Sequence, residues 1–290
     1  MKDVEAKDRR SIQIATPSLG EEEWNALREP IESGWLTQGP KVAAFERAFA
    51  ERHCVKHAIA VTSATTGLHL ALSALDIGPG DEVIVPAFTW VATANAVLYC
   101  GGTPVFVDVD RTTFNISIQD VAHRLTPRTK AVIPVHLFGL CVEVDALRSA
   151  VGSRVAIVED AACAAGAALH DRPAGSLGDL GVFSFHRRKS ITTGEGGMVT
   201  TDNDRLADRI NRLCNHGASV SEEERHRGPR PYLLPEFEEL GFNYRMTDLQ
   251  GAVGLVQLAK LDRFIEERAQ MAAQYRKDLA DVKWLRMPDE

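Results

Sequence analysis

Short runs of β-branched and other apolar residues alternate with longer stretches of helical spacing through the middle of this 290-residue chain. The apolar runs predict strands at residues 58–61, 82–87, 104–110, 131–139, 155–160, 181–185 and 197–201. Strands that alternate with helices are typical of βαβ units that feed a mainly parallel sheet. We therefore expect an α/β fold in which a mainly parallel, mixed sheet of about seven strands is flanked by helices.

Two of the predicted helices begin with capping signals. Ser117 precedes Asp120 at the start of 117–125, and Thr247 precedes Gln250 in the spacing of a capping box. The apolar stripe of the second helix consists of Leu249, Val253, Val256 and Leu261. This stripe predicts one long helix that runs past Tyr275 and is followed by a strand-like fragment, WLRMPDE.

The pattern divides the chain into three parts. We expect an N-terminal segment at 1–35, a large α/β domain at 36–255, and a long connecting helix with the start of a further small domain at 256–290. The stretch RHRGPRPYLLPEFEE is polar and rich in proline, so we expect a connection there. No internal repeat or low-complexity segment interrupts the large domain.

Composition narrows the class of protein. A chain with 44% hydrophobic and 25% charged residues is ordinary for a globular protein. Its apolar runs are too short to span a bilayer, and MKDVEAKDRR lacks the apolar stretch of a signal peptide, so we expect a cytoplasmic protein without membrane contact. The net charge of −7 offers no electrostatic attraction for nucleic acid.

The cysteines are odd in number, widely spaced and without a CxxC pair. This arrangement argues against a disulfide framework and against a structural zinc site, so we expect reduced thiols and no metal. They are Cys54, Cys100, Cys141, Cys163 and Cys214.

The loop TSATTG, at 62–67, lies between a predicted strand and a predicted helix. Its small residues would let backbone amides and hydroxyls converge on an anion such as a phosphate at the positive end of the helix. A plain strand-to-helix turn capped by serine or threonine explains the same letters.

Glu159 and Asp160 end a predicted buried strand in VAIVEDAACAAG. Ligands of open α/β sheets bind at the carboxyl ends of the strands, and a carboxylate there could keep a ring nitrogen protonated. The alternative is an aspartate that caps an alanine-rich helix directly after the strand.

Lys189 lies in FSFHRRKSITTGEGG, between an apolar strand and a glycine-rich loop. A lysine at a strand end, beside a phosphate cradle and a carboxylate, suits a Schiff base with pyridoxal phosphate. A surface lysine within a basic run is the alternative. Trp90 likewise could be a core aromatic residue or a flat face against a cofactor ring.

These motifs stand together in a specific order. Along the chain come SGWLTQGPKVAAFE, TSATTGLHLAL, GDEVIVPAFTWVATANAV, TPVFVDVD, PVHLFG, VEDAACAAGA, FSFHRRKSITTGEGGMVTT and GFNYRMTDLQGAVGLVQL. Through them the chain resembles the sugar aminotransferases of the DegT/DnrJ/EryC1/StrS group over nearly its whole length. The resemblance implies the fold-type I architecture of pyridoxal-phosphate (PLP) enzymes.

The resemblance also implies roles for particular residues. Lys189 would hold the cofactor and move a proton, and Asp160 would face the pyridinium nitrogen. The remaining cofactor contacts would come from Ala64, Thr65, Trp90, Cys163, Ser184 and Asn243. Asn243 matches an asparagine that reaches the phosphate in the neighbouring subunit, which implies a homodimer with shared sites. For His186, Arg187 and Arg188 we favour rim charges near acidic substrates over a catalytic role.

The implied reaction is transamination from glutamate to a keto sugar, most simply a nucleotide-linked 4-keto-6-deoxyhexose, for amino-sugar biosynthesis in lipopolysaccharide or antibiotic assembly. Two departures from the family pattern matter. Cys163 stands where glutamine or histidine is usual, and the small C-terminal domain of the family is expected to be largely missing. A PLP-binding, dimerising remnant without turnover and an aminotransferase for a cyclitol ketone therefore stay open.

Overall fold

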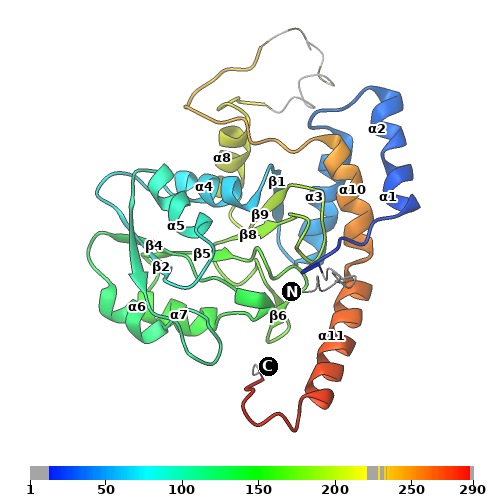
Figure 1. The fold of residues 1–290 in the computed structure, drawn as a ribbon. Coiled ribbons are helices and arrows are strands. Elements are labelled where there is room, and N and C mark those ends of the chain that lie inside the picture. Colours follow the sequence, from blue (N-terminus) through cyan, green and yellow to red (C-terminus); the bar gives the residue numbers. More distant parts are fainter. Residues whose placement is uncertain (1–12, 221–227, 229–231, 233, 288–290) are drawn as a thin grey trace, which may run out of the picture.

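The computed structural model describes residues 13–220, 228, 232 and 234–287, and its centre is a seven-stranded sheet (Figure 1). In spatial order the strands are β1 (His57–Val61), β9 (Gly197–Thr201), β8 (Leu180–Ser184), β5 (Ala156–Asp160), β4 (Thr129–Val132), β2 (Glu82–Pro86) and β3 (Thr103–Val107). Strand β9 is antiparallel to both neighbours, and the other pairs are parallel. The predicted mixed α/β sheet is confirmed.

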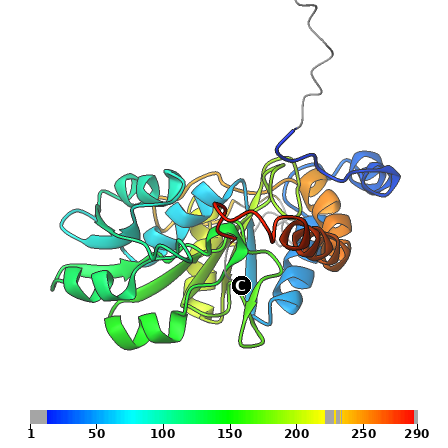
Figure 2. The ribbon, with the colours of Figure 1, turned by 60° about the horizontal axis from the view of Figure 1, so that its bottom comes forward.

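Helices cover both sides of this sheet (Figure 2). Helices α4 (Ala64–Ala74), α5 (Ala92–Tyr99) and α8 (Asp204–Cys214) contribute Leu68, Val97 and Ile210 to one buried cluster. The other side is covered by α3 (Pro40–Arg52), α6 (Ile118–Arg124) and α7 (Val144–Val151), which contribute Phe49, Val121 and Leu147 to a second cluster. The central strands are therefore buried between two layers of helices, as near-continuous apolar runs require, while the edge strand β3 leaves Phe106 half exposed.

Strand β4 is shorter than its apolar run. The ladder of β4 ends at Val132, where the sequence pattern predicts a strand to residue 139. Pro134 has no amide proton for the ladder, and Leu137–Gly139 forms a short 3-10 turn. A small separate hairpin, β6 (Ala168–Leu169) with β7 (Arg172–Pro173), follows β5.

The long C-terminal helix is divided, contrary to the prediction. Helix α10 (Asp248–Ala259) ends at Lys260, and α11 (Leu261–Asp278) then extends away from the sheet (Figure 1). The Lys260 amide donates to the Gln257 carbonyl at 3.1 Å, so the last turn tightens there. Residues 284–287 form no strand, so the strand-like fragment predicted there is also wrong as far as the structure describes it.

A buried polar cluster fastens the N-terminal helix α1 (Glu21–Ala26) to α10. Glu23 is buried and accepts hydrogen bonds from Gln257 Nε2 at 2.8 Å and Lys260 Nζ at 2.6 Å. Burial alone would raise the pKa of Glu23, but these donors and the Gly20 amide outweigh it and hold the pKa at about 2. Helix α2 (Arg28–Ser33) follows α1 and also contacts α10. No helix among the described residues is long and apolar enough to cross a membrane.

Candidate active site

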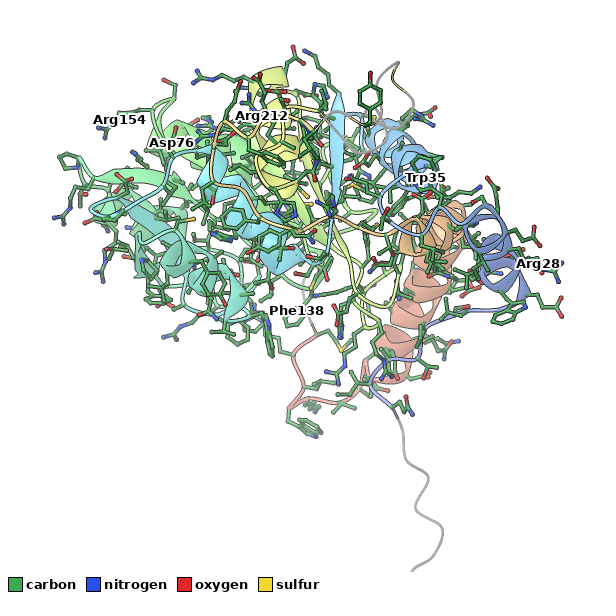
Figure 3. The ribbon with its side chains drawn as sticks, turned by 90° about the horizontal axis from the view of Figure 1, so that it is seen from above. Arg28, Trp35, Asp76, Phe138, Arg154 and Arg212 are labelled. Atoms are coloured by element: carbon green, nitrogen blue, oxygen red, sulfur yellow. The ribbon has the colours of Figure 1, made fainter. Side chains whose placement is uncertain are left out.

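A cavity of about 390 Å³ opens at the carboxyl ends of the central strands, beside the start of α4. Seven of the eight predicted site residues line it: Ala64, Thr65, Trp90, Asp160, Cys163, Ser184 and Lys189. Figure 3 shows Phe138, from the turn after β4, on the opposite edge of the molecule from Asp76 and Arg154. Asp76 and Arg154 lie at the amino ends of the strands, so the cavity occupies the edge at which open α/β sheets bind ligands.

Asp160 is the last residue of β5 and is only 5% exposed. Its Oδ2 accepts a hydrogen bond from Thr93 Oγ1 at 2.8 Å, and its Oδ1 accepts one from the Ala162 amide at 3.2 Å. Burial raises the pKa of Asp160, and these donors together with the charge of Lys189 counter only part of that rise. A buried carboxylate of this kind favours a cationic partner in the cavity.

The alternative interpretation of Asp160, as the cap of an alanine-rich helix after the strand, holds only in part. Its contact with Ala162 does cap the chain after β5, but residues 161–167 form turns and no helix follows. The expected alanine-rich helix is therefore absent from this described segment.

Glu159 lies next to Asp160 but does not enter the cavity. Successive side chains of a strand point to opposite faces, and Glu159 is completely buried on the other face. It contacts His136 Nε2 at 2.7 Å and accepts bonds from the amides of Gly175, Leu177 and Gly178 at 2.8, 2.8 and 2.6 Å. Because His136 Nδ1 accepts from the Val142 amide at 3.1 Å, the ring proton lies on Nε2 and faces Glu159. Glu159 thus holds the loop before β8 in place through hydrogen bonds from three of its amides.

Lys189 lies five residues beyond the end of β8, in a turn in which its amide donates to the His186 carbonyl at 2.8 Å. Its Nζ reaches across the cavity and donates to Cys163 Sγ at 3.1 Å. The lysine is only partly exposed, whereas Arg187 and Arg188 beside it are both exposed. The surface interpretation of Lys189 therefore does not hold, while His186 and Arg188 line the cavity.

The start of α4 forms one wall of the cavity. Ser63 caps this helix by accepting from the Thr66 amide at 3.2 Å, which leaves the amides of Ala64 and Thr65 in the first turn without an intrahelical acceptor. Ser184 faces the same wall, because its neighbour Phe183 points into the core on the other side of β8. The wall combines amide and hydroxyl donors with the positive end of a helix dipole.

Gly197, the first residue of β9, allows this wall to approach the sheet. A Cβ at Gly197 would lie 2.7 Å from the Ser63 carbonyl carbon and 2.8 Å from the Ala64 nitrogen. No side chain fits at these distances. The glycine is therefore required for close backbone packing, which the glycine-rich sequence signals but does not locate.

Three exposed residues relate to the cavity in different ways. Trp90 is 77% exposed and lines the cavity, so it is not a core aromatic residue. Phe138 is also exposed and has a φ of 56°, an unusual conformation for an aromatic residue and one that concentrates at functional sites. Asn243 is exposed and does not line the cavity of its own chain.

Thr93 is the site residue that the sequence interpretation missed. It is fully buried, and besides Asp160 it contacts Thr89 Oγ1 at 3.1 Å. Its signal in the sequence is its spacing of three residues from Trp90, which lies just before α5 and whose carbonyl accepts from the Thr93 amide at 3.2 Å.

A family model and two solved aminotransferase structures match this chain. The model of the DegT/DnrJ/EryC1/StrS aminotransferase family matches residues 17–290. The aminotransferase TlmJ from Streptoalloteichus hindustanus is 37% identical, with a TM-score of 0.89 over 97% of this chain and 74% of that one. Helicobacter pylori PseC, an aminotransferase involved in the biosynthesis of pseudoaminic acid, is 30% identical, with a TM-score of 0.85 over 94% and 71%.

A third similar structure holds a nucleotide sugar. GDP-4-keto-6-deoxymannose-3-dehydratase (ColD), with bound GDP-perosamine, is 29% identical to this chain. Its TM-score is 0.85 over 93% of this chain and 74% of that one.

Proposed function

Since this chain belongs to the DegT/DnrJ/EryC1/StrS aminotransferase family and is a PLP-dependent transaminase, we propose that it transfers an amino group from glutamate to a nucleotide-linked 4-keto-6-deoxyhexose. The observation that carries the proposal is the convergence of Lys189 Nζ and the buried Asp160 carboxylate on one cavity beside a helix start. The nucleotide-linked 4-keto-6-deoxy sugar in the name of ColD, and the amino sugar bound to it, support the substrate class.

The residues that line the cavity fit PLP at four points: the phosphate, the ring nitrogen, the aldehyde carbon and the face of the ring. The amides of Ala64 and Thr65, with the Ser184 hydroxyl, suit a phosphate. Burial raises the pKa of Asp160, and a protonated ring nitrogen would stabilise the charged form of this carboxylate. The Lys189 amine would bond the aldehyde carbon, and Trp90 would cover the ring.

Once bound, PLP supplies an electron-withdrawing ring that stabilises negative charge on the substrate carbon. The protein provides proton transfer and charge. We propose that Lys189 Nζ takes the proton from the carbon that bears the amino group of glutamate and returns a proton to the sugar carbon in the second half of the reaction. Asp160 keeps its negative charge toward the ring, held in place by the Thr93 hydroxyl.

The mouth of the cavity suits acidic substrates. His186 and Arg188 line it on the side of Lys189, and both can interact with a carboxylate of glutamate or with a sugar-linked diphosphate. Leu68 and Val135 also line the cavity, and their apolar side chains would help to exclude water from the reacting atoms. His186 and Arg188 would therefore bind the substrate, while Lys189 would transfer the proton.

We also propose that the active unit is a homodimer and that residues 36–255 form the unit that holds the cofactor. Asn243 is exposed and away from the cavity of its own chain, as expected of a residue that serves the phosphate of a neighbouring subunit. Its backbone is held by an isolated bridge to Asn215, at the end of α8, so its side chain is presented from a defined position.

An absorbance titration tests the lysine and the donor together. Purified protein is mixed with PLP, scanned, and scanned again after glutamate is added; Lys189→Ala is the test variant. Lys56→Ala is the matched control, because Lys56 is exposed and precedes β1 at the opposite edge of the sheet. We expect a band that requires Lys189 but not Lys56 and that glutamate converts to the pyridoxamine form.

Two results would contradict the proposal. A band that is unchanged in Lys189→Ala would remove Lys189 from its role. A lysine-dependent band that glutamate leaves unchanged would contradict glutamate as the donor and favour a protein that binds PLP without turnover. If glutamate does convert the cofactor, nucleotide-linked 4-keto-6-deoxyhexoses are then compared with cyclitol ketones as acceptors, and a preference for the cyclitol would overturn the substrate class.

A further inference from the structure

Two nucleophilic side chains meet at the floor of the cavity. Lys189 Nζ lies 3.1 Å from Cys163 Sγ, and both side chains line the same cavity and are partly exposed. The residues come from different parts of the fold, Cys163 from the turn after β5 and Lys189 from the turn after β8. The register of these two parallel neighbours, with Asp160 opposite Val182, brings the two turns together.

The other four cysteines have different surroundings. Cys141 and Cys214 are buried, and burial raises the pKa of their thiols to about 11 and about 12. Cys100 contacts Ser73 Oγ at 3.6 Å, and burial raises its pKa as well. Cys54 is exposed at the end of α3. Cys163 is thus distinguished by a cavity that small molecules can enter and by an amine in contact with its sulfur.

We propose that Cys163 and Lys189 form a reversible covalent sulfur–nitrogen cross-link when the protein meets hydrogen peroxide while the lysine amine is free. This inference rests on the proposed role of Lys189 in catalysis, because the cross-link would remove the amine that the reaction needs. It assigns to Cys163 a function that the polar residues usual at this position cannot perform.

The chemistry balances in two steps. In the first, the sulfur of Cys163 attacks one oxygen of hydrogen peroxide, the O–O bond breaks, and a sulfenic acid and one water are formed. In the second, the Lys189 amine attacks that sulfur, the S–O bond breaks, an S–N bond forms and a second water leaves. The sulfur loses two electrons, which the peroxide takes up. Two equivalents of an external thiol reverse the change, releasing the Cys163 thiol and the Lys189 amine and forming one external disulfide.

Geometry favours the second step over competing reactions. The amine already touches the sulfur, and the flexible four-carbon stem of lysine can supply the remaining approach. An intramolecular attack within such a contact has a high effective concentration and competes well with further oxidation of the sulfenic acid. The state of the cofactor would decide when the cross-link can form. The Lys189 amine would be free when the site holds pyridoxamine phosphate and bonded to the cofactor when it holds PLP.

Intact and peptide mass spectrometry of the full chain test the proposal. The pyridoxamine-phosphate-loaded and PLP-loaded proteins are each treated with hydrogen peroxide at low molar excess. We expect the pyridoxamine form to lose two hydrogens, about 2 Da, and to yield one cross-linked peptide that joins Cys163 to Lys189 and disappears with dithiothreitol. The PLP form should give at least about tenfold less of this peptide, because its amine is occupied.

Three variants make the test specific. Cys163→Ser should abolish the cross-link, and Cys54→Ser, which changes the exposed thiol, should leave it unchanged. Lys189→Ala should instead leave a sulfenic acid at position 163 that dimedone traps. Oxidation of Cys163 to the sulfinic acid with no cross-linked peptide in the pyridoxamine form would overturn the proposal.

The two proposals can fail separately. Loss of the glutamate-driven conversion with a cross-link still present would overturn the function and leave the cross-link standing. A normal glutamate conversion without any cross-link would overturn the cross-link alone.

Discussion

Asp160 and Glu159 are adjacent carboxylates with opposite roles, and the difference comes from the faces of β5. Asp160 points into the cavity, where two donors hold it and burial raises its pKa. Glu159 points the other way and is satisfied by His136 and three backbone amides. A pair of acidic residues at a strand end therefore places one carboxylate in the cavity and the other against the loop before β8.

The Thr93→Val variant tests the contact behind Asp160. Valine keeps the volume but cannot donate to the carboxylate, and a hydrogen bond to a charged group is worth about 1.5–3 kcal/mol. We expect PLP to bind roughly 10- to 100-fold more weakly, measured by absorbance titration, with the fold retained.

The matched control for this change is Thr89→Val. Thr89 contacts the Thr93 hydroxyl at 3.1 Å rather than the carboxylate, so its loss should weaken binding much less. Equal dissociation constants for the two variants would show that the hydrogen bond from Thr93 does not support the cofactor site.

At the scale of elements, the site depends on how closely α4 approaches β9. Strand β9 is antiparallel to its neighbours, and its first residue, Gly197, lies against the backbone of Ser63 and Ala64. The helix start, the strand end that carries Ser184 and the turn that carries Lys189 are thereby brought around one cavity. A side chain at Gly197 would keep the start of α4 away from the sheet.

Replacing Gly197 with alanine should separate these elements. The new Cβ would meet backbone atoms at 2.7–2.8 Å, and backbone cannot yield as a flexible side chain does. We expect overpacking to cost about 1–3 kcal/mol of unfolding free energy and to weaken PLP binding more than about tenfold. Thermal unfolding and absorbance titration measure the two effects.

Gly78→Ala is the control, since a Cβ at Gly78 meets no heavy atom within 4 Å. It should leave PLP affinity unchanged. If Gly197→Ala binds PLP as tightly as Gly78→Ala, the close approach of α4 to β9 is not needed for the site.

At the scale of the whole molecule, the position of Asn243 supports the homodimer proposed above. Asn243 is exposed on its own chain and outside the cavity that holds the other seven predicted residues. Apolar side chains are exposed in the cavity lining, at Trp90, and at the two ends of the adjoining helix α5, at Val91, Leu98 and Tyr99. Such a surface is consistent with a symmetric dimer in which each copy completes the site of the other.

Coexpression of two inactive variants tests the shared sites. Lys189→Ala lacks the amine, and Asn243→Asp places a negative charge beside the proposed phosphate position, so each homodimer should fail to convert PLP with glutamate. In a mixed dimer, one site would combine the intact Lys189 of one chain with the intact Asn243 of the other. Random pairing should then restore about a quarter of the normal rate.

The readout is the rate of the glutamate-dependent spectral change in the coexpressed sample. A simple mixture of the separately purified variants, assayed before subunits exchange, serves as the control and should remain inactive. Absence of any recovery in mixed dimers confirmed by mass would contradict a site shared in this way.

Local patterns in the sequence determined much of this protein. The order of strands and helices followed from periodicity, and the capping of α6 by Ser117 and of α10 by Thr247 is confirmed, because a cap involves residues three positions apart. The family and its cofactor also followed from ordered motifs, and the comparisons confirm both. These features depend on neighbours along the chain, which one sequence displays directly.

Only the tertiary structure decided which distant groups touch. The Thr93 hydroxyl lies 67 residues from Asp160 in the chain, and the Cys163 thiol 26 residues from Lys189, yet each pair is in contact. At the break between α10 and α11, Lys260 likewise forms an ion pair with Glu23, which precedes it by 237 residues. Sheet order and layer packing set these distances, and no periodicity along the chain encodes them. The sequence thus determined the elements and the chemistry available, while packing decided which side chains share the cavity.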